Sequence, residues 1–335
     1  MKKTIDNWVH IPGLHCGSVT LRDVMTHYGY KWSEAMCFGI GGGLGFYYTI
    51  KKDTSPSHMI FVRGPMMETT FLSFVDKQTD WKHSSEDVVS MVKKYIDLDV
   101  PVVIQTDIYY LDYYNSNTHF PGHIVSVWGY DDESKTIYVA DNHLEGLQNV
   151  PYENFKQGMA SNDLSNPLNN NFIDVRLDKP VDNLEDLIPS AVKENARKML
   201  YGCSGGRGES SVYKIKEWSE DLPNWSDVED WKWCSRFGYQ VIKKRGVCGA
   251  GFRWIYRDFL IEAEEIVPLI KELGLAKKMD FIGSKWSDIA LLLKEISEKD
   301  LPNETLLKTA SQKAYELWEL ESDFYNTVAE KIETE

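Results

Sequence analysis

The sequence predicts an α+β domain over residues 1–180, followed by an all-α domain over residues 181–335. Three observations lead to this fold class. In the first part, helix-like and strand-like segments alternate, and residues 123–143 have the pattern of an antiparallel hairpin. After the polar segment "DKPVDNLEDLIPS" (178–190), most segments carry apolar residues at spacings of three and four, with charged residues between them. The length of 335 residues also favours two domains.

The N-terminal part contains two predicted helices. Residues 18–29, "SVTLRDVMTHYG", have an apolar stripe at helical spacing, with Gly29 at the position of a C-terminal cap. Residues 33–43, "SEAMCFGIGGG", predict a second, short helix with Ser33 as its N-cap and glycines at its end. These glycines lack the G-x-G-x-x-G spacing and the G-K-[ST] ending of phosphate-binding loops. We therefore expect a tight connection from helix to strand there, or a place where a substrate approaches the backbone.

The rest of the first domain is predicted to be mainly strands. Four segments have strand composition: "FYYTIKK", "MIFVRG", "VPVVIQTDIYYL" and "FIDVRL". A helix over residues 85–99, capped by Ser85, separates the second of these strands from the third. The clearest signal is the pair of alternating strands that flank the polar turn "YDDESK", which predicts an antiparallel hairpin over residues 123–143.

The second domain is predicted from amphipathic helical segments. They are "PSAVKENARKMLYG", "WSDVEDWKWCSRFGYQVIKKRG", "FRWIYRDFLIEAEEIVPLIKELG", "WSDIALLLKEISEKD" and "ETLLKTASQKAYELWELESDFYNTVAEKIETE". The segment "SGGRGESS" (204–211) is expected to be a flexible loop.

Composition excludes several classes of protein. The net charge of −14, from 37 basic and 51 acidic residues, disfavours nucleic acid and anionic membrane surfaces as partners. The start "MKKTIDNWVH" lacks the apolar core of a signal peptide, and "CFGIGGGLGFYYTI" is too short to span a bilayer. The 5 cysteines are odd in number, scattered and without a C-x-x-C pair, which disfavours a disulfide framework and a structural zinc site. We therefore expect a cytoplasmic protein with free thiols.

Cys16 directly precedes the first predicted helix, in "GLHCGSVTLRDVMTHYG". A thiol attacks an acyl group as thiolate, and its free pKa of about 8.5 leaves only a small ionised fraction near neutrality. The N-terminus of a helix favours negative charge through its dipole and its free N–H groups. These N–H groups can also bind the oxyanion of a tetrahedral intermediate. Cys16 is therefore a candidate nucleophile, and the alternative is a small residue of the core.

A nearby imidazole that takes the thiol proton would activate Cys16 further. His123 begins the first strand of the predicted hairpin, and Asp141 ends the second. Because the turn lies midway between them, we expect the two residues to face each other across the open end of the hairpin. There the carboxylate of Asp141 can orient the imidazole of His123. The order Cys, His, Asp is that of papain-like enzymes, in which a helix with the nucleophile packs on a sheet with the other two residues.

Other residues could take these roles. Four further histidines are alternatives for the base: His10, His15, His119 and His143. Asn142 could replace Asp141 as the orienting residue if the strand register slips by one. His119 and His123 have the i, i+4 spacing of zinc ligands on a helix, but the intervening "PG" interrupts a helix, so no metal site is expected. Cys37 lies among apolar neighbours and is expected to be a core residue.

Four segments carry motifs that occur together in one known family. Residues 15–46 contain, in order, H-C-x-S/T, a helix, S-E and a glycine-rich run. Residues 107–132 and 137–143 contain a histidine segment and an aspartate segment, and residues 249–266 contain F-R-x-x-Y-x-x-F-L-x-E-A. In this order they resemble the butirosin biosynthesis protein H family, with the helical domain commonly attached to it. The resemblance extends over nearly the whole chain.

The resemblance implies a papain-like fold and an acyltransferase of antibiotic biosynthesis, similar to the amide synthase of closthioamide biosynthesis. Such an enzyme moves an acyl group from the thioester of an acyl or peptidyl carrier protein to a small amine. Carried over by position, Cys16 is the nucleophile, His123 the general base and Asp141 its orienting residue. The acyl group would arrive on the phosphopantetheine of the partner, and no cofactor or metal of the protein's own is implied. No glutamine precedes Cys16, as one does in papain-like peptidases, so the Cys16 N–H would need a different second donor for the oxyanion.

This function predicts two binding surfaces. Carrier proteins are typically acidic around their prosthetic arm, so docking on a protein of net charge −14 requires a local basic patch. The candidates for that patch are Lys243, Lys244, Arg245, Arg253 and Arg257. The candidates for contact with a cationic amine are Glu34, Asp107 or Asp112, and the aromatic residues Tyr109 and Tyr110. The rival functions are hydrolysis by the same three residues, as in a peptidase or thioesterase, and a non-catalytic scaffold.

Overall fold

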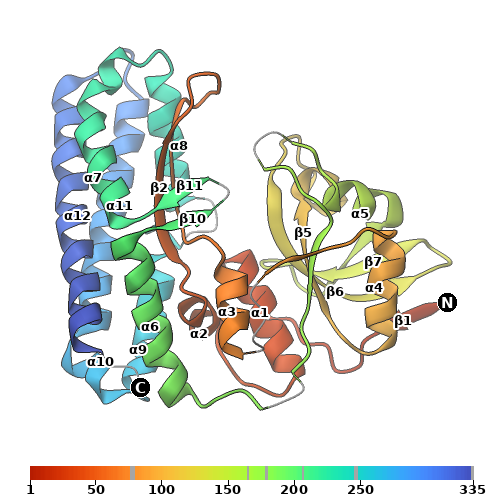
Figure 1. Ribbon diagram of the computed structural model, residues 1–335. Helices are drawn as coiled ribbons and strands as arrows, with labels where there is room; N and C mark the ends of the chain where they lie inside the picture. Colours follow the sequence, from red (N-terminus) through yellow and green to blue (C-terminus); the bar gives the residue numbers. More distant parts are fainter. Residues whose placement is uncertain (76–79, 164–165, 178–179, 206, 245–247, 333–335) are drawn as a thin grey trace. The chain divides into compact units, whose positions relative to one another are not determined.

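A computed structural model describes residues 1–75, 80–163, 166–177, 180–205, 207–244 and 248–332. The chain divides into two compact units (Figure 1). The sheet unit comprises Met1–Cys37 and Glu68–Val181, and the helical unit comprises Phe38–Met67 and Asp182–Glu335. The sequence prediction counted residues 38–67 in the first domain, whereas the structure groups them with the helical unit. The chain passes between the units within helix α2 (Glu34–Ile40) and at the start of helix α3 (Met67–Val75).

The strands of the sheet unit form one antiparallel sheet, as the sequence predicts. Its order is β4 (Lys82–His83), β9 (Asn171–Asp174), β5 (Val102–Asp107), β6 (Pro121–Asp131), β7 (Thr136–Ala140) and β8 (Leu147–Pro151), and β1 (Lys2–Thr4) pairs with β6. Strand β6 is central and almost entirely buried, which fits its apolar composition.

Strands β6 and β7 form the predicted hairpin. Asp131 lies opposite Thr136 beside the turn, and Ser126 lies opposite Ala140 toward the open end. The register shifts by one residue between Val127 and Gly129. With this register Asp141, the first residue after β7, aligns with Val125, two positions along β6 from the direct alignment with His123 that the sequence predicts. Because this offset is two residues, the side chains of His123 and Asp141 lie on the same face of the sheet.

Helices pack against this sheet. Helix α1 (Cys16–His27) packs against β6, and α5 (Tyr152–Met159) packs against β5 and against α4 (Val88–Asp97).

Ser33 caps α2 as predicted, since its hydroxyl oxygen accepts a hydrogen bond from Met36 N at 2.9 Å. The prediction that Ser85 caps α4 is wrong. Asp87 directly precedes the first helical residue, and its carboxylate accepts the N–H of Ser90 at 3.0 Å.

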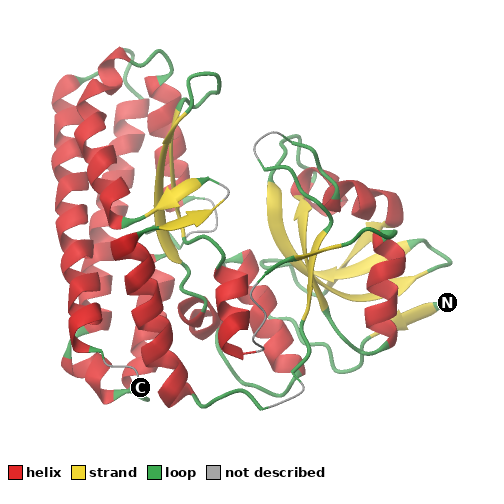
Figure 2. Cartoon of the chain, in the orientation of Figure 1, coloured by secondary structure: helices red, strands yellow, loops and turns green. Residues whose placement is uncertain are grey.

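The helical unit consists largely of helices, drawn red in Figure 2. They are α6 (Leu184–Tyr201), α7 (Val212–Asp221), α8 (Trp231–Lys243), α9 (Arg253–Glu264), α10 (Pro268–Glu272), α11 (Leu275–Ser297) and α12 (Glu304–Lys331), with the 3₁₀ helix η3 (Leu222–Asp227). This confirms a largely helical C-terminal region. The expected flexible loop over residues 204–211 contains most of a short hairpin instead, formed by β10 (Cys203–Gly205) and β11 (Gly208–Ser210).

A second hairpin, β2 (Leu44–Ile50) and β3 (His58–Arg63), belongs to the core of the helical unit. Strand β2 packs against α7 and β3 packs against α8. The ring of Phe46 lies 5.6 Å from the ring of Trp218 and 5.4 Å from that of Trp286. The apolar side chains of the hairpin are therefore buried among helices, which explains why residues 38–67 fold with them.

Among the helices of the described residues, none is both long enough and apolar enough to cross a membrane.

Candidate active site

Cys16 is the first residue of helix α1 and is half-buried. The helix begins one or two residues earlier than the sequence predicts, because His15 acts as its N-cap. His15 has extended backbone angles, φ −117° and ψ 124°, and its Nδ1 accepts the N–H of Ser18 at 3.2 Å. The first helical hydrogen bond runs from Val19 N to His15 O at 3.0 Å. The N–H groups of Cys16 and Gly17 therefore precede the intrahelical ladder, and the positive end of the helix dipole lies at the thiol.

The carboxylate of Glu34 stabilises the turn that leads into Cys16. Glu34 Oε1 accepts the N–H of His15 at 2.7 Å, the N–H of Leu14 at 3.1 Å and the hydroxyl of Ser18 at 3.2 Å. A glycine is required beside it, since a Cβ at Gly13 would lie 2.3 Å from Glu34 Oε2. The sequence identified Glu34 as a candidate contact for the amine. The structure places its carboxylate on the turn that leads into Cys16, and contact with a substrate stays a prediction.

His123 and Asp141 form a buried pair beside the open end of the β6–β7 hairpin. His123 Nε2 lies 2.8 Å from Asp141 Oδ1 and 3.0 Å from Oδ2. His123 is 6 % exposed and Asp141 is fully buried. The pairing inferred from the hairpin is therefore present, as a diagonal contact between residues two positions apart in the register.

Two tyrosines that sequence reasoning missed complete the surroundings of Asp141. Tyr113 donates its hydroxyl hydrogen to Asp141 Oδ2 at 2.7 Å, and Tyr114 donates to Oδ1 at 3.2 Å. The Tyr114 hydroxyl also lies 3.3 Å from His123 Nε2. Both tyrosines lie in the short 3₁₀ helix η2 (Asp112–Tyr114), within the aromatic segment that precedes His123. The aromatic composition of this segment was the only sequence signal for these two tyrosines, and it did not indicate that they contact Asp141.

The electrostatics of this cluster favour a charged imidazole. Burial is the largest influence on His123 and lowers its pKa, but the charge and hydrogen bond of Asp141, followed by a hydrogen bond with Cys16 and its charge, raise the pKa to about 10. For Asp141, burial again acts first and raises the pKa. The charge and hydrogen bond of His123 and the two tyrosine hydroxyls outweigh it, so the pKa of Asp141 is lowered.

The alternative histidines have other partners. His10 lies beneath α1, with Nδ1 2.5 Å from Asp23 Oδ2 and Nε2 2.8 Å from the carbonyl oxygen of Leu144. His15 caps α1, as described above. His143 is exposed, and its Nδ1 lies 3.2 Å from Asn142 Oδ1. Asn142 donates its amide hydrogen to Leu14 O at 3.3 Å, so this amide contacts the turn that leads into Cys16.

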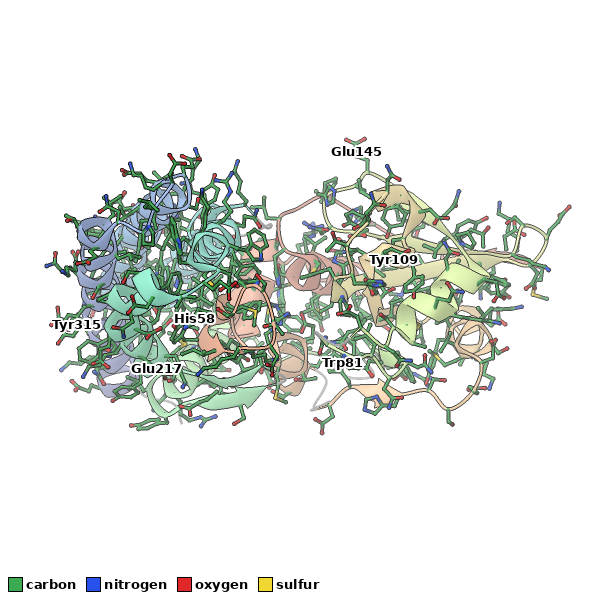
Figure 3. All side chains as sticks on the ribbon, turned by 90° about the horizontal axis from the view of Figure 1, so that it is seen from above. His58, Trp81, Tyr109, Glu145, Glu217 and Tyr315 are labelled. Atoms are coloured by element: carbon green, nitrogen blue, oxygen red, sulfur yellow. The ribbon has the colours of Figure 1, made fainter. Side chains whose placement is uncertain are left out.

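His119 pairs with a second buried carboxylate, Asp107. Asp107 Oδ2 lies 2.7 Å from His119 Nδ1 and accepts the Ser161 hydroxyl at 2.7 Å, while Oδ1 accepts the N–H of Tyr109 at 3.1 Å. Asp107 is therefore fully engaged by the protein. The ring of Tyr109 stacks on that of His119, with centroids 4.2 Å apart, and Tyr109 is 44 % exposed. Figure 3 shows Tyr109 among the side chains of the sheet unit. Tyr110 lies beside Tyr109, at 5.1 Å between centroids.

The residues predicted to dock a carrier protein lie in the helical unit and differ in accessibility. Arg253 is fully buried, and its guanidinium pairs with the carboxylate of Glu321 at 2.8 Å, so it contributes nothing to a surface patch. Arg257 is half-exposed and pairs with Asp258 and Asp280, each at 2.7 Å. The remaining described candidates are Lys243, half-buried, and Lys244, exposed, whereas Arg245 lies outside the described residues.

Two family models match the chain. The model described as butirosin biosynthesis protein H, N-terminal, matches residues 15–142, a stretch that includes Cys16, His123 and Asp141. The model described as a domain of unknown function, DUF4872, matches residues 153–328. The resemblance to a two-part family is thereby confirmed. None of the curated proteins compared with the chain matches it, so the expected similarity to the closthioamide amide synthase stays a prediction.

Proposed function

Because the chain belongs to the DUF4872 family and its N-terminal part matches butirosin biosynthesis protein H, we propose that it is a biosynthetic acyltransferase with Cys16 as nucleophile. In this proposal, His123 moves protons and Asp141 orients His123. The acyl donor is a carrier-protein thioester, and the acceptor is a small amine. The name of the matching N-terminal family supports a role in secondary-metabolite biosynthesis.

One observation carries the proposal: His123, whose Nε2 lies 2.8 Å from the buried carboxylate of Asp141, has a pKa that the thiol of Cys16 also raises. This arrangement of nucleophile, base and orienting group is the general signature of covalent acyl transfer. A raised His123 pKa favours the imidazolium form, which stabilises a thiolate beside it. Cys16 is the first residue of α1, so the positive end of the helix dipole also stabilises a thiolate at Cys16 Sγ. A helix with the nucleophile that packs on a strand with the histidine is also the arrangement of papain-like enzymes, and we include that fold in the proposal.

The first half-reaction transfers the acyl group to the enzyme. The proton of the Cys16 thiol passes to His123, and the thiolate attacks the carbonyl carbon of the donor thioester. The N–H groups of Cys16 and Gly17 are available to the oxyanion that forms. When this intermediate collapses, the bond from carbon to the pantetheine sulfur breaks, and His123 returns the proton to that sulfur. A thioester replaces a thioester, so the acyl-enzyme forms at little net free-energy change.

The second half-reaction forms the amide. The amine attacks the acyl-enzyme carbonyl, the new C–N bond forms, and the bond from carbon to Cys16 Sγ breaks. His123 accepts a proton from the amine nitrogen and delivers it to the departing Cys16 sulfur. We assign contact with the acceptor to Tyr109 and Tyr110, and positioning roles to Glu34 and Asp107, whose carboxylates are occupied within the protein. Docking of the carrier protein is assigned to Lys243, Lys244 and Arg257.

The test is intact-mass analysis of the purified chain after incubation with an acyl-pantetheine thioester. We expect an acyl adduct on the wild type, none on Cys16→Ala, and release of the adduct as an amide when a primary amine is added. Cys203→Ala is the matched control, because Cys203 is also half-buried and free but lies in the helical unit. Release as free acid at a rate that the amine leaves unchanged would support a hydrolase instead. No adduct with any acyl thioester would support a scaffold and overturn the proposal.

A further inference from the structure

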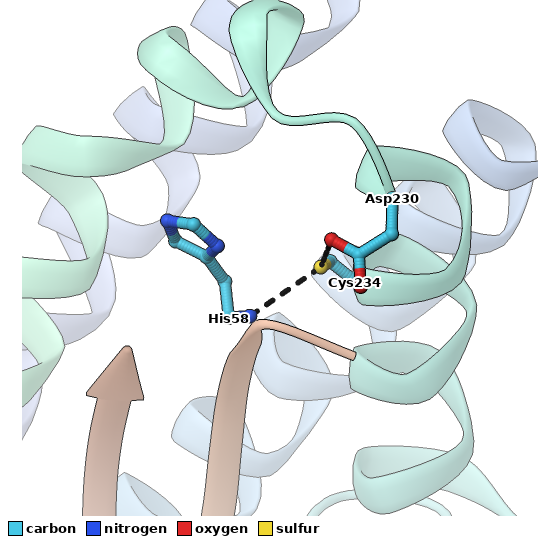
Figure 4. Close-up of side chains that lie close together, drawn as sticks. All are labelled: His58, Asp230 and Cys234. Atoms are coloured by element: carbon cyan, nitrogen blue, oxygen red, sulfur yellow. Dashed lines mark hydrogen bonds between the residues drawn. The ribbon is translucent and has the colours of Figure 1, made fainter. Parts of the chain in front are cut away.

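Three residues of the helical unit bring a nitrogen, an oxygen and a sulfur ligand together. Asp230 and Cys234 lie at the start of helix α8, four residues apart and therefore on one face, and His58 is the first residue of strand β3 (Figure 4). One potential ligand atom from each residue lies within 4.8 Å of the other two. Cys234 is fully buried, while His58 and Asp230 are half-buried. The cluster is thus enclosed on one side and accessible on the other.

The hydroxyl of Ser57 lies between these three side chains. It donates to Asp230 Oδ1 at 2.5 Å, and it lies 2.8 Å from His58 Nδ1 and 3.7 Å from Cys234 Sγ. Cys234 Sγ in turn lies 3.2 Å from Asp230 Oδ1. A single atom in contact with all three groups occupies the position that a bound cation would need. The Ser57 side chain can leave it by rotation about one bond.

The second nitrogen of His58 faces another carboxylate. His58 Nε2 lies 3.7 Å from Asp221 Oδ2, and this oxygen also accepts the indole N–H of Trp225 at 3.2 Å. A histidine that binds a metal through one nitrogen usually donates the other N–H to a carboxylate, which fixes the ring and raises its basicity. Asp221 is placed for that role, and Trp225 fixes Asp221.

We propose that His58, Asp230 and Cys234 bind one zinc ion, with Asp221 orienting His58. Imidazole, carboxylate and thiolate are the ligands that zinc prefers, and three protein ligands leave a fourth position open to water or a substrate group. Closing the ligands to zinc bonding distances of about 2.0 to 2.3 Å requires a small inward movement of His58 and displacement of the Ser57 hydroxyl. Binding transfers the thiol proton of Cys234 to solvent, since the thiolate is the ligand. This site is independent of the acyl-transfer proposal.

The same contacts could also serve only as a hydrogen-bond network that fastens the start of β3 to α8. Asp230 supports this alternative, because its Oδ2 accepts the hydroxyl of Ser55 at 2.7 Å and the N–H of Ser57 at 2.9 Å. The two interpretations make different predictions for added metal. A network alone gains nothing from zinc, whereas a site binds it and is stabilised by it.

The test uses the full chain, stripped with a chelator, dialysed against zinc and assayed for metal content. We expect about one zinc per chain for the wild type, a rise in its melting temperature, and a thiolate charge-transfer band when Co²⁺ replaces zinc. Cys234→Ser is expected to lose the band and the zinc-dependent rise, while Cys203→Ser, at a half-buried free thiol of the same unit, keeps both. Asp221→Asn is expected to weaken zinc binding about ten- to a hundredfold without abolishing it.

Two results would overturn the proposal. One is a wild type that retains no zinc after dialysis, and the other is a folded Cys234→Ser that retains as much as the wild type. If Cys234→Ser does not fold, His58→Gln gives the same comparison at a half-buried position. Ser57→Ala separates the interpretations further: a zinc site keeps or gains affinity when this hydroxyl is removed, and a pure network shows only a lower melting temperature.

Discussion

Tyr113 donates a hydrogen bond of 2.7 Å to the carboxylate of Asp141, the residue that also holds His123 at 2.8 Å. Asp141 is fully buried, and an unpaired charge in such a place is costly. Tyr113, Tyr114 and His123 together satisfy both carboxylate oxygens. Tyr113 therefore fixes the carboxylate that fixes the imidazole, although the tyrosine itself makes no contact with Cys16 among the interactions described.

Tyr113→Phe tests this relationship. The substitution keeps the ring and removes one hydrogen bond to a charged group, which costs about 1.5 to 3 kcal/mol of stability. We expect a fall of that size in the free energy of unfolding, measured by urea denaturation, and slower acylation of Cys16. Tyr138→Phe is the control, because Tyr138 contacts the half-buried carboxylate of Asp131 at 3.4 Å on the same hairpin. Equal effects of the two substitutions would show that Tyr113 has no special role at Asp141.

Glu34→Gln tests whether the carboxylate of Glu34 stabilises the turn that leads into Cys16. The neutral amide weakens the hydrogen bonds from His15 N and Leu14 N and the bond from the Ser18 hydroxyl, since bonds to charged acceptors are the stronger ones. We expect a loss of about 1 to 3 kcal/mol of stability and slower alkylation of Cys16 by iodoacetamide. Glu153→Gln, in the first turn of α5, is the matched control, because its side chain is 79 % exposed. Unchanged alkylation in Glu34→Gln would contradict a positioning role.

The sequence predicted the position of Cys16 at a helix start and the contact of His123 with Asp141 because local patterns determine both. A helix start places Cys16, and a hairpin with a recognisable turn places His123 near Asp141. The bulge at Val127 and Gly129 was not visible in the sequence, although it puts His123 and Asp141 on one face of the sheet. Without it the register beside the turn would align Asp141 with Ser126, whose side chain lies on the opposite face from that of His123. The contacts of Tyr113, Tyr114 and Glu34 depend on how separate segments pack, and residue spacing carries no information on that.

The same limit applies to the division of the chain. Residues 38–67 have the composition of strands, so the sequence prediction grouped them with the sheet domain. Their partners lie far along the chain: Arg253 Nη1 donates to Val62 O at 3.1 Å, and Ser211 N donates to Phe46 O at 3.1 Å. The absence of a C-x-x-C pair could not reveal the proposed zinc site for the same reason, because its ligands His58 and Cys234 come from segments far apart in the sequence.

Removal of one partner from the buried ion pair of Arg253 and Glu321 should strongly destabilise the helical unit. Both side chains are fully buried, and Glu321 Oε1 also accepts the indole N–H of Trp286 at 2.6 Å. Breaking such a pair leaves an uncompensated charge and costs about 3 to 5 kcal/mol. We expect Arg253→Met to lower the free energy of unfolding by that amount. Arg257→Met is the control, because its pairs with Asp258 and Asp280 are half-exposed and worth about 0 to 1 kcal/mol. Similar losses in both variants would show that burial does not set the strength of the Arg253 pair.

His123 should make stability depend on pH in the alkaline range. Its pKa in the folded chain is about 10, above the value of about 6.5 expected for an unfolded histidine. Between these values the folded chain binds the proton and the unfolded chain does not. The stabilisation is therefore fully present below pH of about 6.5 and is lost as the pH rises through about 10, with a slope of up to about 1.4 kcal/mol per pH unit. We expect the free energy of unfolding of the wild type to fall from pH 7 to pH 9 more steeply than that of His123→Gln. Parallel pH profiles for the two proteins would mean that Asp141 and Cys16 do not hold the imidazole in its charged form.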